Sequence, residues 1–208
     1  AYNLGHIPEE CSCEIVRKLA EDIDDEARDW VAFLLYDVPE ECRCEIASKL
    51  VEDDYWEVRK DVAYRLPDLP KECACDIARK LADDDEWRVR GEVVYKLYNI
   101  PKECRCEIAR KLADDDEWDV RKKVAYNLDK LPEECACELA RKLADDVNSD
   151  VRYWVARSLD NLPEECACEL ALKLIKDEHP SVREAVKDVA DNLPEECRRR
   201  VKILAMFG

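Results

Sequence analysis

Several residue types on which catalytic and ligand-binding motifs depend are scarce in this sequence. It contains no Thr and no Gln, only three Gly, and only two His, His6 and His179, which stand far apart in unrelated positions. There is no Gly-rich phosphate loop, no H-E-x-x-H pair and no nucleophile elbow. Acidic runs such as ADDDEW lack the alternating ligands and the glycine of a calcium loop. We therefore expect no catalytic residues, no metal site, no cofactor and no enzyme activity.

Positive charge is also in short supply. The 208 residues carry a net charge of −17, although 41% are charged and 47% are hydrophobic. This charge excludes nucleic acid as a partner, because phosphates need a basic surface, and it disfavours an anionic membrane surface. No apolar run approaches a membrane span, so we expect no membrane insertion. Scarce amides beside abundant Glu, Lys and Arg match a thermophile protein, although a helical repeat favours the same residues.

What the sequence does contain is a unit of 31 residues that recurs along the chain. Each unit opens with a segment such as LPEECACELARKLADD, and the first six continue with one such as EWDVRKKVAYNL. The opening prolines are Pro8, Pro39, Pro70, Pro101, Pro132, Pro163 and Pro194. No linker interrupts the series. We predict a single solenoid domain over 1–208, with the end of a helix at 1–7, six repeats at 8–193 and a terminal half-repeat at 194–208.

Each repeat predicts two helices. Helix A begins at the proline, whose missing N–H costs nothing there, and ends at an acidic turn. We interpret the aspartate of this turn as the N-cap of helix B. These aspartates are Asp22, Asp53, Asp84, Asp115, Asp146 and Asp177. One helix pair cannot bury two apolar stripes but stacked pairs can, so we predict an all-α fold, a right-handed α-α superhelix (solenoid) of two-helix repeats of 31 residues.

The run VRKKVAYNLDKLPEECACELARKLADDVNSDVRYWVA resembles HEAT-like repeats, and its L-A-x-D and V-R-x-x-V-A patterns are most similar to the leucine-rich-variant type. The resemblance covers nearly the whole chain. The 31-residue unit is longer than the usual leucine-rich-variant unit, and the C-x-C pairs belong to neither pattern. The resemblance implies that helix B lines a partner-binding side and that recurring arginines form a ladder with the turn aspartates. These arginines are Arg28, Arg59, Arg90, Arg121, Arg152 and Arg183.

The 13 cysteines follow the repeat. Residues two apart on a helix point about 200° from each other, so one Cys of each C-x-C pair faces the preceding helix A and the other faces the next. Helix axes lie about 8–10 Å apart, which brings facing Cα atoms within the disulfide range of about 4.4–6.8 Å. The predicted disulfide ladder is Cys13–Cys42, Cys44–Cys73, Cys75–Cys104, Cys106–Cys135, Cys137–Cys166 and Cys168–Cys197. Cys11 is then free or paired elsewhere.

Two alternatives remain for the cysteines. Buried free thiols pack well as small hydrophobes, but they do not explain why Arg199 replaces the one Cys that would face no further helix. Metal thiolate sites usually use C-x-x-C spacing with converging ligands, whereas these pairs diverge. A disulfide ladder indicates an extracellular or cell-surface protein, or else the cytoplasm of a hyperthermophile, where disulfides also persist.

An aromatic position recurs on helix B, opposite its apolar stripe. The residues of this aromatic column are Tyr2, Phe33, Tyr64, Tyr95 and Tyr126, with Trp30 and Trp154 on the same outer side. An exposed row of aromatic side chains indicates contact with another surface. The alternative is that the rings simply lie over neighbouring Lys and Arg side chains.

Both ends of the sequence look apolar and incomplete. The first residues match the end of a helix B, and the last helix A carries Ile203, Met206 and Phe207 with no helix B after it. Because solenoid ends expose core, we expect another copy to cover them, and a head-to-tail contact that does not close gives a filament. The alternative is a fragment of a longer array.

Two functions follow from these patterns. One is a non-enzymatic structural scaffold stiffened by inter-repeat disulfides, with itself as protein partner in a homo-oligomer or filament. The alternative is a soluble adaptor that binds a protein on the helix B face, with its cysteines reduced. An adaptor gains by flexing, whereas a disulfide at every repeat interface removes that freedom, and this favours the scaffold.

Overall fold

The computed structural model describes residues 9–207, and over this range the chain is entirely helical apart from its turns, with no strand. The helices A are α1 (Glu9–Leu19), α3 (Glu40–Leu50), α5 (Lys71–Leu81), α7 (Lys102–Leu112), α9 (Glu133–Leu143), α11 (Glu164–Leu174) and α13 (Glu195–Phe207). The helices B are α2 (Asp25–Phe33), α4 (Trp56–Tyr64), α6 (Trp87–Lys96), α8 (Trp118–Tyr126), α10 (Ser149–Arg157) and α12 (Pro180–Val189). The predicted alternation of two helices per repeat is confirmed.

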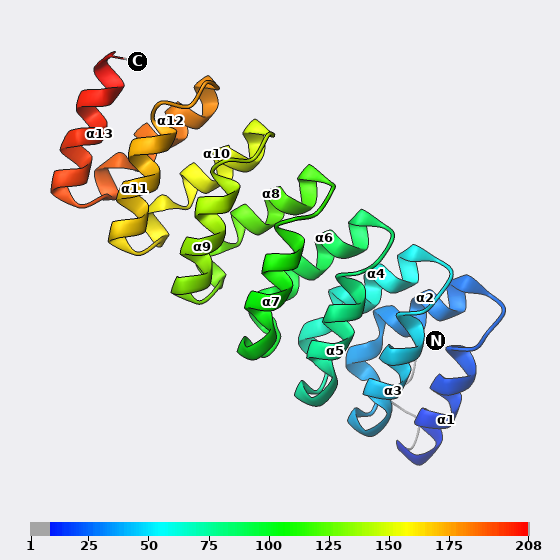
Figure 1. Cartoon of the computed structure of the whole chain (residues 1–208). Coiled ribbons are helices and arrows are strands. Elements are labelled where there is room, and N and C mark those ends of the chain that lie inside the picture. The colour runs from blue at the N-terminus through cyan, green and yellow to red at the C-terminus, as the bar shows by residue number, and fades with distance from the viewer. Residues whose placement is uncertain (1–8, 208) are drawn as a thin grey trace. The chain divides into compact units, whose positions relative to one another are not determined.

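The chain divides into two compact units, one ending at Ile108 and the other beginning at Ala109. In the first unit, α2, α4 and α6 lie side by side in one layer, and α1, α3 and α5 form the other (Figure 1). In the second unit, α8, α10 and α12 form one layer, and α9, α11 and α13 the other. Each unit is therefore a stack of helix pairs. One continuous domain over 1–208 stays a prediction, and the segment 1–7 lies outside the described residues.

Between each helix B and the next helix A the structure forms a 3-10 helix. These helices are η2 (Leu35–Asp37), η3 (Leu66–Asp68), η4 (Leu97–Asn99), η5 (Leu128–Lys130), η6 (Leu159–Asn161) and η7 (Ala190–Asn192). In five of them the first residue is a leucine that is at most 1% exposed. Burying such a side chain is worth about 1.5–3 kcal/mol, so this connection is part of the core.

The turn aspartates are not the N-caps of helix B, and this interpretation was wrong. The N-cap residues stand two positions later and are Asp24, Tyr55, Glu86, Glu117, Asn148 and His179. The Oδ1 atom of each turn aspartate accepts the N–H of that N-cap residue at 2.8–3.0 Å. The aspartates thus form Asx-turns that lead into helix B, which leaves their second carboxylate oxygen available to an arginine.

Candidate functional site

Successive helices A are joined near their first turns by cysteine pairs. The structure places five of the predicted pairs in disulfide contact, with Cα atoms 5.5–6.0 Å apart. These pairs are Cys13–Cys42, Cys44–Cys73, Cys75–Cys104, Cys137–Cys166 and Cys168–Cys197. The pair Cys106–Cys135 stays a prediction, and the side chain of Cys11 lies outside the described residues.

In four helices B (α2, α4, α8 and α10) an arginine links two successive repeats at the acidic turns, whereas Arg183 of α12 donates to carbonyls of its own repeat. Arg152 donates from Nε and Nη2 to the carboxylate of Asp177 at 2.7 and 2.9 Å, and from Nη1 to the carbonyl of Asp146 in its own repeat at 2.8 Å. The same fork joins Arg28–Asp53, Arg59–Asp84 and Arg121–Asp146. The arginine side chains are 9–14% exposed and the aspartates 4–7%, so these four pairs form a buried ladder.

The buried ladder has a clear electrostatic signature. Burial by itself would raise the pKa of Asp177, but the hydrogen bonds from Arg152 and from the N–H of His179 outweigh it and hold that pKa below its ordinary value. The same balance lowers the pKa of Asp53, where Arg28 and the N–H of Tyr55 donate. Both aspartates are therefore ionised at neutral pH, and each holds two neighbouring repeats together.

A second ladder, which the sequence analysis missed, joins the exposed sides of successive helices A. Its arginine pairs are Arg17–Glu45, Arg79–Glu107, Arg110–Glu138 and Arg141–Glu169. Their arginine side chains are 43–52% exposed and their glutamates 52–60%. The recurring spacing of 28 residues between Arg and Glu is the signal that could have revealed it.

The aromatic column is exposed on helices B, as its spacing predicts. Its side chains are 40–51% exposed at Phe33, Tyr64, Tyr95 and Tyr126, and Trp30 and Trp154 are partly exposed. On α13, Ile203 and Met206 are 56% and 79% exposed, while Tyr2 and the side chain of Phe207 lie outside the described residues. The role of these residues as an interface stays a prediction.

Basic side chains cover part of this column in the first unit. The guanidinium carbon of Arg65 lies 4.7 Å from the ring centroid of Phe33 and 5.0 Å from that of Tyr64. The Nζ atom of Lys96 lies 3.8 Å from the centroid of Tyr64. All three distances fall within the range of a cation–π interaction, so Phe33 and Tyr64 attract cations.

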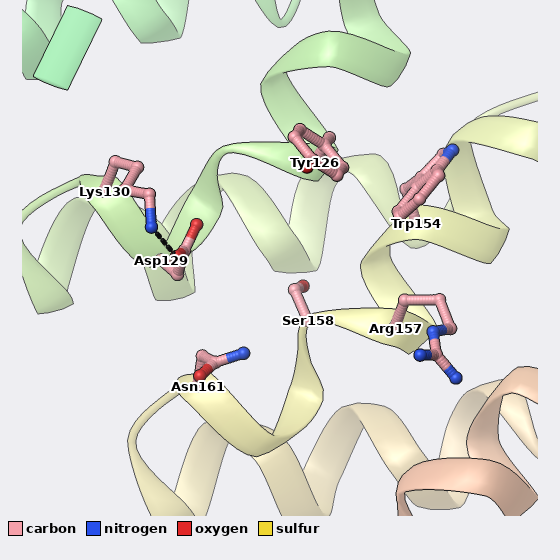
Figure 2. A pocket seen from close by; sticks show the side chains of 7 residues that line it. All are labelled: Tyr126, Asp129, Lys130, Trp154, Arg157, Ser158 and Asn161. Carbon is pink, nitrogen blue, oxygen red and sulfur yellow. Dashed lines mark hydrogen bonds and ion pairs between the residues drawn. The ribbon is translucent and has the colours of Figure 1, made fainter.

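In the second unit the column borders a cavity of about 220 Å³ (Figure 2). Tyr126 and Trp154 form one wall, with ring centroids 4.8 Å apart at an angle of 87°. Ser158 and Asn161 line the opposite side, and Figure 2 shows them across the open space from the two rings. The rest of the lining consists of three charged residues, Asp129, Lys130 and Arg157.

One carboxylate on the helix B face of the first unit has no cationic partner. Asp61 of α4 is half-buried, and among the described residues no group makes a hydrogen bond or an ion pair to its side chain. Burial, and then the charge of Asp29, raise its pKa to about 6. The pKa of Asp61 is thus raised, whereas the bond from Arg152 lowers the pKa of Asp177 and keeps that carboxylate ionised.

The described residues hold no cluster of three or more His, Cys, Asp or Glu that is arranged as a metal site. None of the helices between residues 9 and 207 has both the length and the apolar character of a membrane span.

Solved structures with low sequence identity share the fold of this chain. The chain is an α-solenoid: it is similar to an engineered protein (21% identity, 92% of this chain and 97% of that one, TM-score 0.54). It is also similar to the complex of CpcE and CpcF of phycocyanin lyase from a Nostoc species (16% identity, 94% of this chain and 94% of that one, TM-score 0.57). A third similar structure is a designed armadillo repeat protein in complex with a (KR)4 peptide (18% identity, 92% of this chain and 96% of that one, TM-score 0.53).

The family model for HEAT repeats matches residues 44–129. Over these residues the repeats are HEAT-like, and there the resemblance seen in the sequence is confirmed. The closer likeness to the leucine-rich-variant type stays a prediction. No curated protein matches the chain.

Proposed function

We propose that this repeat solenoid is a non-enzymatic structural scaffold whose repeats are locked together by disulfides. The observation that carries the proposal is a double link between the same repeats. Cys137–Cys166 joins the first turns of two successive helices A, and Arg152–Asp177 joins the same two repeats beyond the other end of those helices. Two links at separated points oppose bending between the repeats. A stack stiffened in this way suits a load-bearing or spacing role better than an adaptable one.

The disulfides support a cellular location, and exposed apolar side chains support self-association. Oxidised cysteines fit an extracellular or cell-surface protein, or the cytoplasm of a hyperthermophile. Self-association into a filament remains the proposed assembly, and the exposed Ile203 and Met206 of α13 are apolar side chains that contact with a second copy would cover. An enzyme activity is not part of the proposal, because no group of residues described above combines a nucleophile, a base and a substrate cavity.

The test is thermal unfolding of the oxidised protein with and without reductant. Each disulfide closes a loop of about 30 residues, which the chain-entropy model values at roughly 3–4 kcal/mol, so reduction should lower Tm strongly. The matched control is a variant with every Cys replaced by Ala, whose Tm should not respond to reductant. Non-reducing peptide mapping should find Cys168 linked to Cys197. Free thiols throughout a protein never exposed to reductant would refute the scaffold.

Light scattering of the oxidised sample at rising concentration tests self-assembly, and a constant monomer mass would exclude it.

A second candidate, the adaptor with reduced cysteines, is favoured by one observation. The aromatic column is exposed along the helix B face, and a similar designed armadillo protein is described in complex with a (KR)4 peptide. The reduction experiment separates the two candidates, because an adaptor should keep its fold and its Tm when reductant is present.

A further inference from the structure

In the first unit, a basic side chain lies beside Phe33 and another lies beside Tyr64. Arg65 directly follows Tyr64 and reaches back to the preceding repeat, where it lies over Phe33 and donates from Nε to the Phe33 carbonyl at 2.7 Å. Lys96 directly follows Tyr95 and reaches back in the same way, to Tyr64. In both repeats a cation supplied by the next repeat fills the space beside an aromatic side chain.

The equivalent position in the second unit carries a short side chain. Ser158 stands three repeats of 31 after Arg65 and two after Lys96. It is 7% exposed, and its hydroxyl donates to the carbonyl of Val155 in its own helix at 2.9 Å. It therefore does not extend over Tyr126, and the cavity of about 220 Å³ lies beside that ring instead (Figure 2).

We propose that this cavity binds the guanidinium group of an arginine side chain from a partner protein. The cavity, called the Tyr126 pocket, is lined by Tyr126, Asp129, Lys130, Trp154, Arg157, Ser158 and Asn161. The bound group would take the place beside Tyr126 that Arg65 takes beside Phe33. Tyr126 and Trp154 offer aromatic surface to a cation, and the Asn161 side-chain oxygen and the Oδ1 atom of Asp129, whose other oxygen bonds Lys130, offer acceptors. Arginine fits better than lysine, because its planar group stacks on a ring and donates in the same plane.

The two basic residues of the lining do not oppose a cation, because each already has a carboxylate partner. Lys130 forms an ion pair with Asp129, and Arg157 forms one with Asp188 at 3.2 Å. In Figure 2 the guanidinium of Arg157 points away from Tyr126. The chain as a whole carries a charge of −17, which favours the approach of a basic partner.

The proposal goes beyond the scaffold and does not rest on its disulfides, so it is tested on the oxidised full chain. Nα-acetyl-arginine amide is titrated while two-dimensional NMR follows the Trp154 indole and the Ser158 amide. We expect saturable shifts at both groups. The citrulline analogue has the same shape but no charge and should bind about tenfold more weakly, since a cation–π contact is worth about 1–2 kcal/mol. Tighter binding of the glutamate analogue would instead assign the pocket to anions through Lys130 and Arg157, and would overturn the proposal.

Two matched variants test the comparison on which the proposal stands. Ser158→Arg restores the arrangement of the first unit and should abolish the arginine shifts while leaving Tm unchanged. Arg65→Ser should open an equivalent pocket beside Phe33 and create a second set of shifts there. If Ser158→Arg fails to fold, Tyr126→Leu removes the ring but keeps its apolar bulk, and should weaken binding. Arginine shifts that persist in the folded Ser158→Arg variant, or no new site in Arg65→Ser, would refute the proposal.

Discussion

Two ladders of arginine–carboxylate pairs run through the repeats, and they differ in burial rather than in chemistry. In the buried ladder, Arg152 and Asp177 are 9% and 7% exposed. In the exposed ladder, Arg141 and Glu169 are 49% and 53% exposed. Both arginines donate from two nitrogens, with distances of 2.7–3.0 Å. The distances are similar, but Arg152 bonds both oxygens of Asp177 and also the carbonyl of Asp146, whereas both donors of Arg141 reach the same oxygen of Glu169. Burial and bonding pattern therefore both favour a larger contribution from the buried pair.

Burial increases both the desolvation cost of forming the first pair and the free energy lost when one partner is removed. A buried pair costs much desolvation, and removing one partner leaves a charge that water cannot reach. An exposed pair is screened by water, and each side chain is well solvated when its partner is absent. The comparison therefore predicts a large loss of stability at one ladder and almost none at the other.

The largest effect is expected for Arg152→Ala. The variant leaves Asp177 without its cationic partner and removes the donor to the Asp146 carbonyl. We expect a loss of about 3 kcal/mol, which is a fall in Tm of roughly 6–12 °C for a protein of this size. Thermal unfolding followed by circular dichroism measures it. Arg152→Lys is the control: it keeps the charge but not the fork, and should recover only part of the loss. A Tm within 2 °C of the parent would contradict this account of the buried ladder.

The same pair predicts an acid dependence. The pKa of Asp177 is lowered in the folded protein, so its contribution to stability is present above its ordinary pKa of 3.8 and is lost as the pH falls below that value. Tm of the parent should fall towards that of Arg152→Ala on acidification. A difference between the two that stays constant from pH 6 to about pH 2 would exclude this linkage.

A smaller effect is expected at Asp61, a half-buried carboxylate that lacks an arginine. Its pKa is raised to about 6 from 3.8, so ionisation destabilises the folded state, and this cost appears as the pH rises from about 4 to about 6. Asn imitates the protonated form. Asp61→Asn should therefore gain about 1 kcal/mol at pH 7, after a discount for solvent screening, or roughly 2–4 °C in Tm. At pH 4 the gain should be close to zero, and an equal gain at both pH values would contradict the raised pKa.

The periodic features of the molecule were predictable from the sequence. The 31-residue spacing gives the two helices per repeat, and the replacement of a cysteine by Arg199 selects the register that pairs Cys168 with Cys197. The buried ladder came from the family resemblance. These features repeat in most units, so one local argument applies many times.

Features that depend on a choice between similar local contacts were not predictable. An aspartate that caps helix B and one that forms an Asx-turn before it both accept a nearby N–H, so the sequence could not place the cap at Asn148 rather than at Asp146. The Tyr126 pocket was missed for a different reason. It exists because Ser158 is short and bonds to its own helix, which is a departure from the repeat rather than part of it.

The smallest effect is expected for Arg141→Ala, which tests whether the exposed ladder contributes to stability. Arg141 donates from Nε and Nη2 to Glu169 at 3.0 and 2.8 Å, and this pair raises the pKa of Arg141 and lowers that of Glu169. The distances alone would rank this pair beside Arg152–Asp177. Because both groups are about half exposed, water replaces the lost partner and Tm should not change beyond the error of measurement. Raising the salt concentration should likewise leave Arg141→Ala and the parent equal, since screening removes the pair's remaining attraction. A fall in Tm comparable to that of Arg152→Ala would show that burial does not separate the two ladders, and that the arginine–carboxylate contact itself stabilises both.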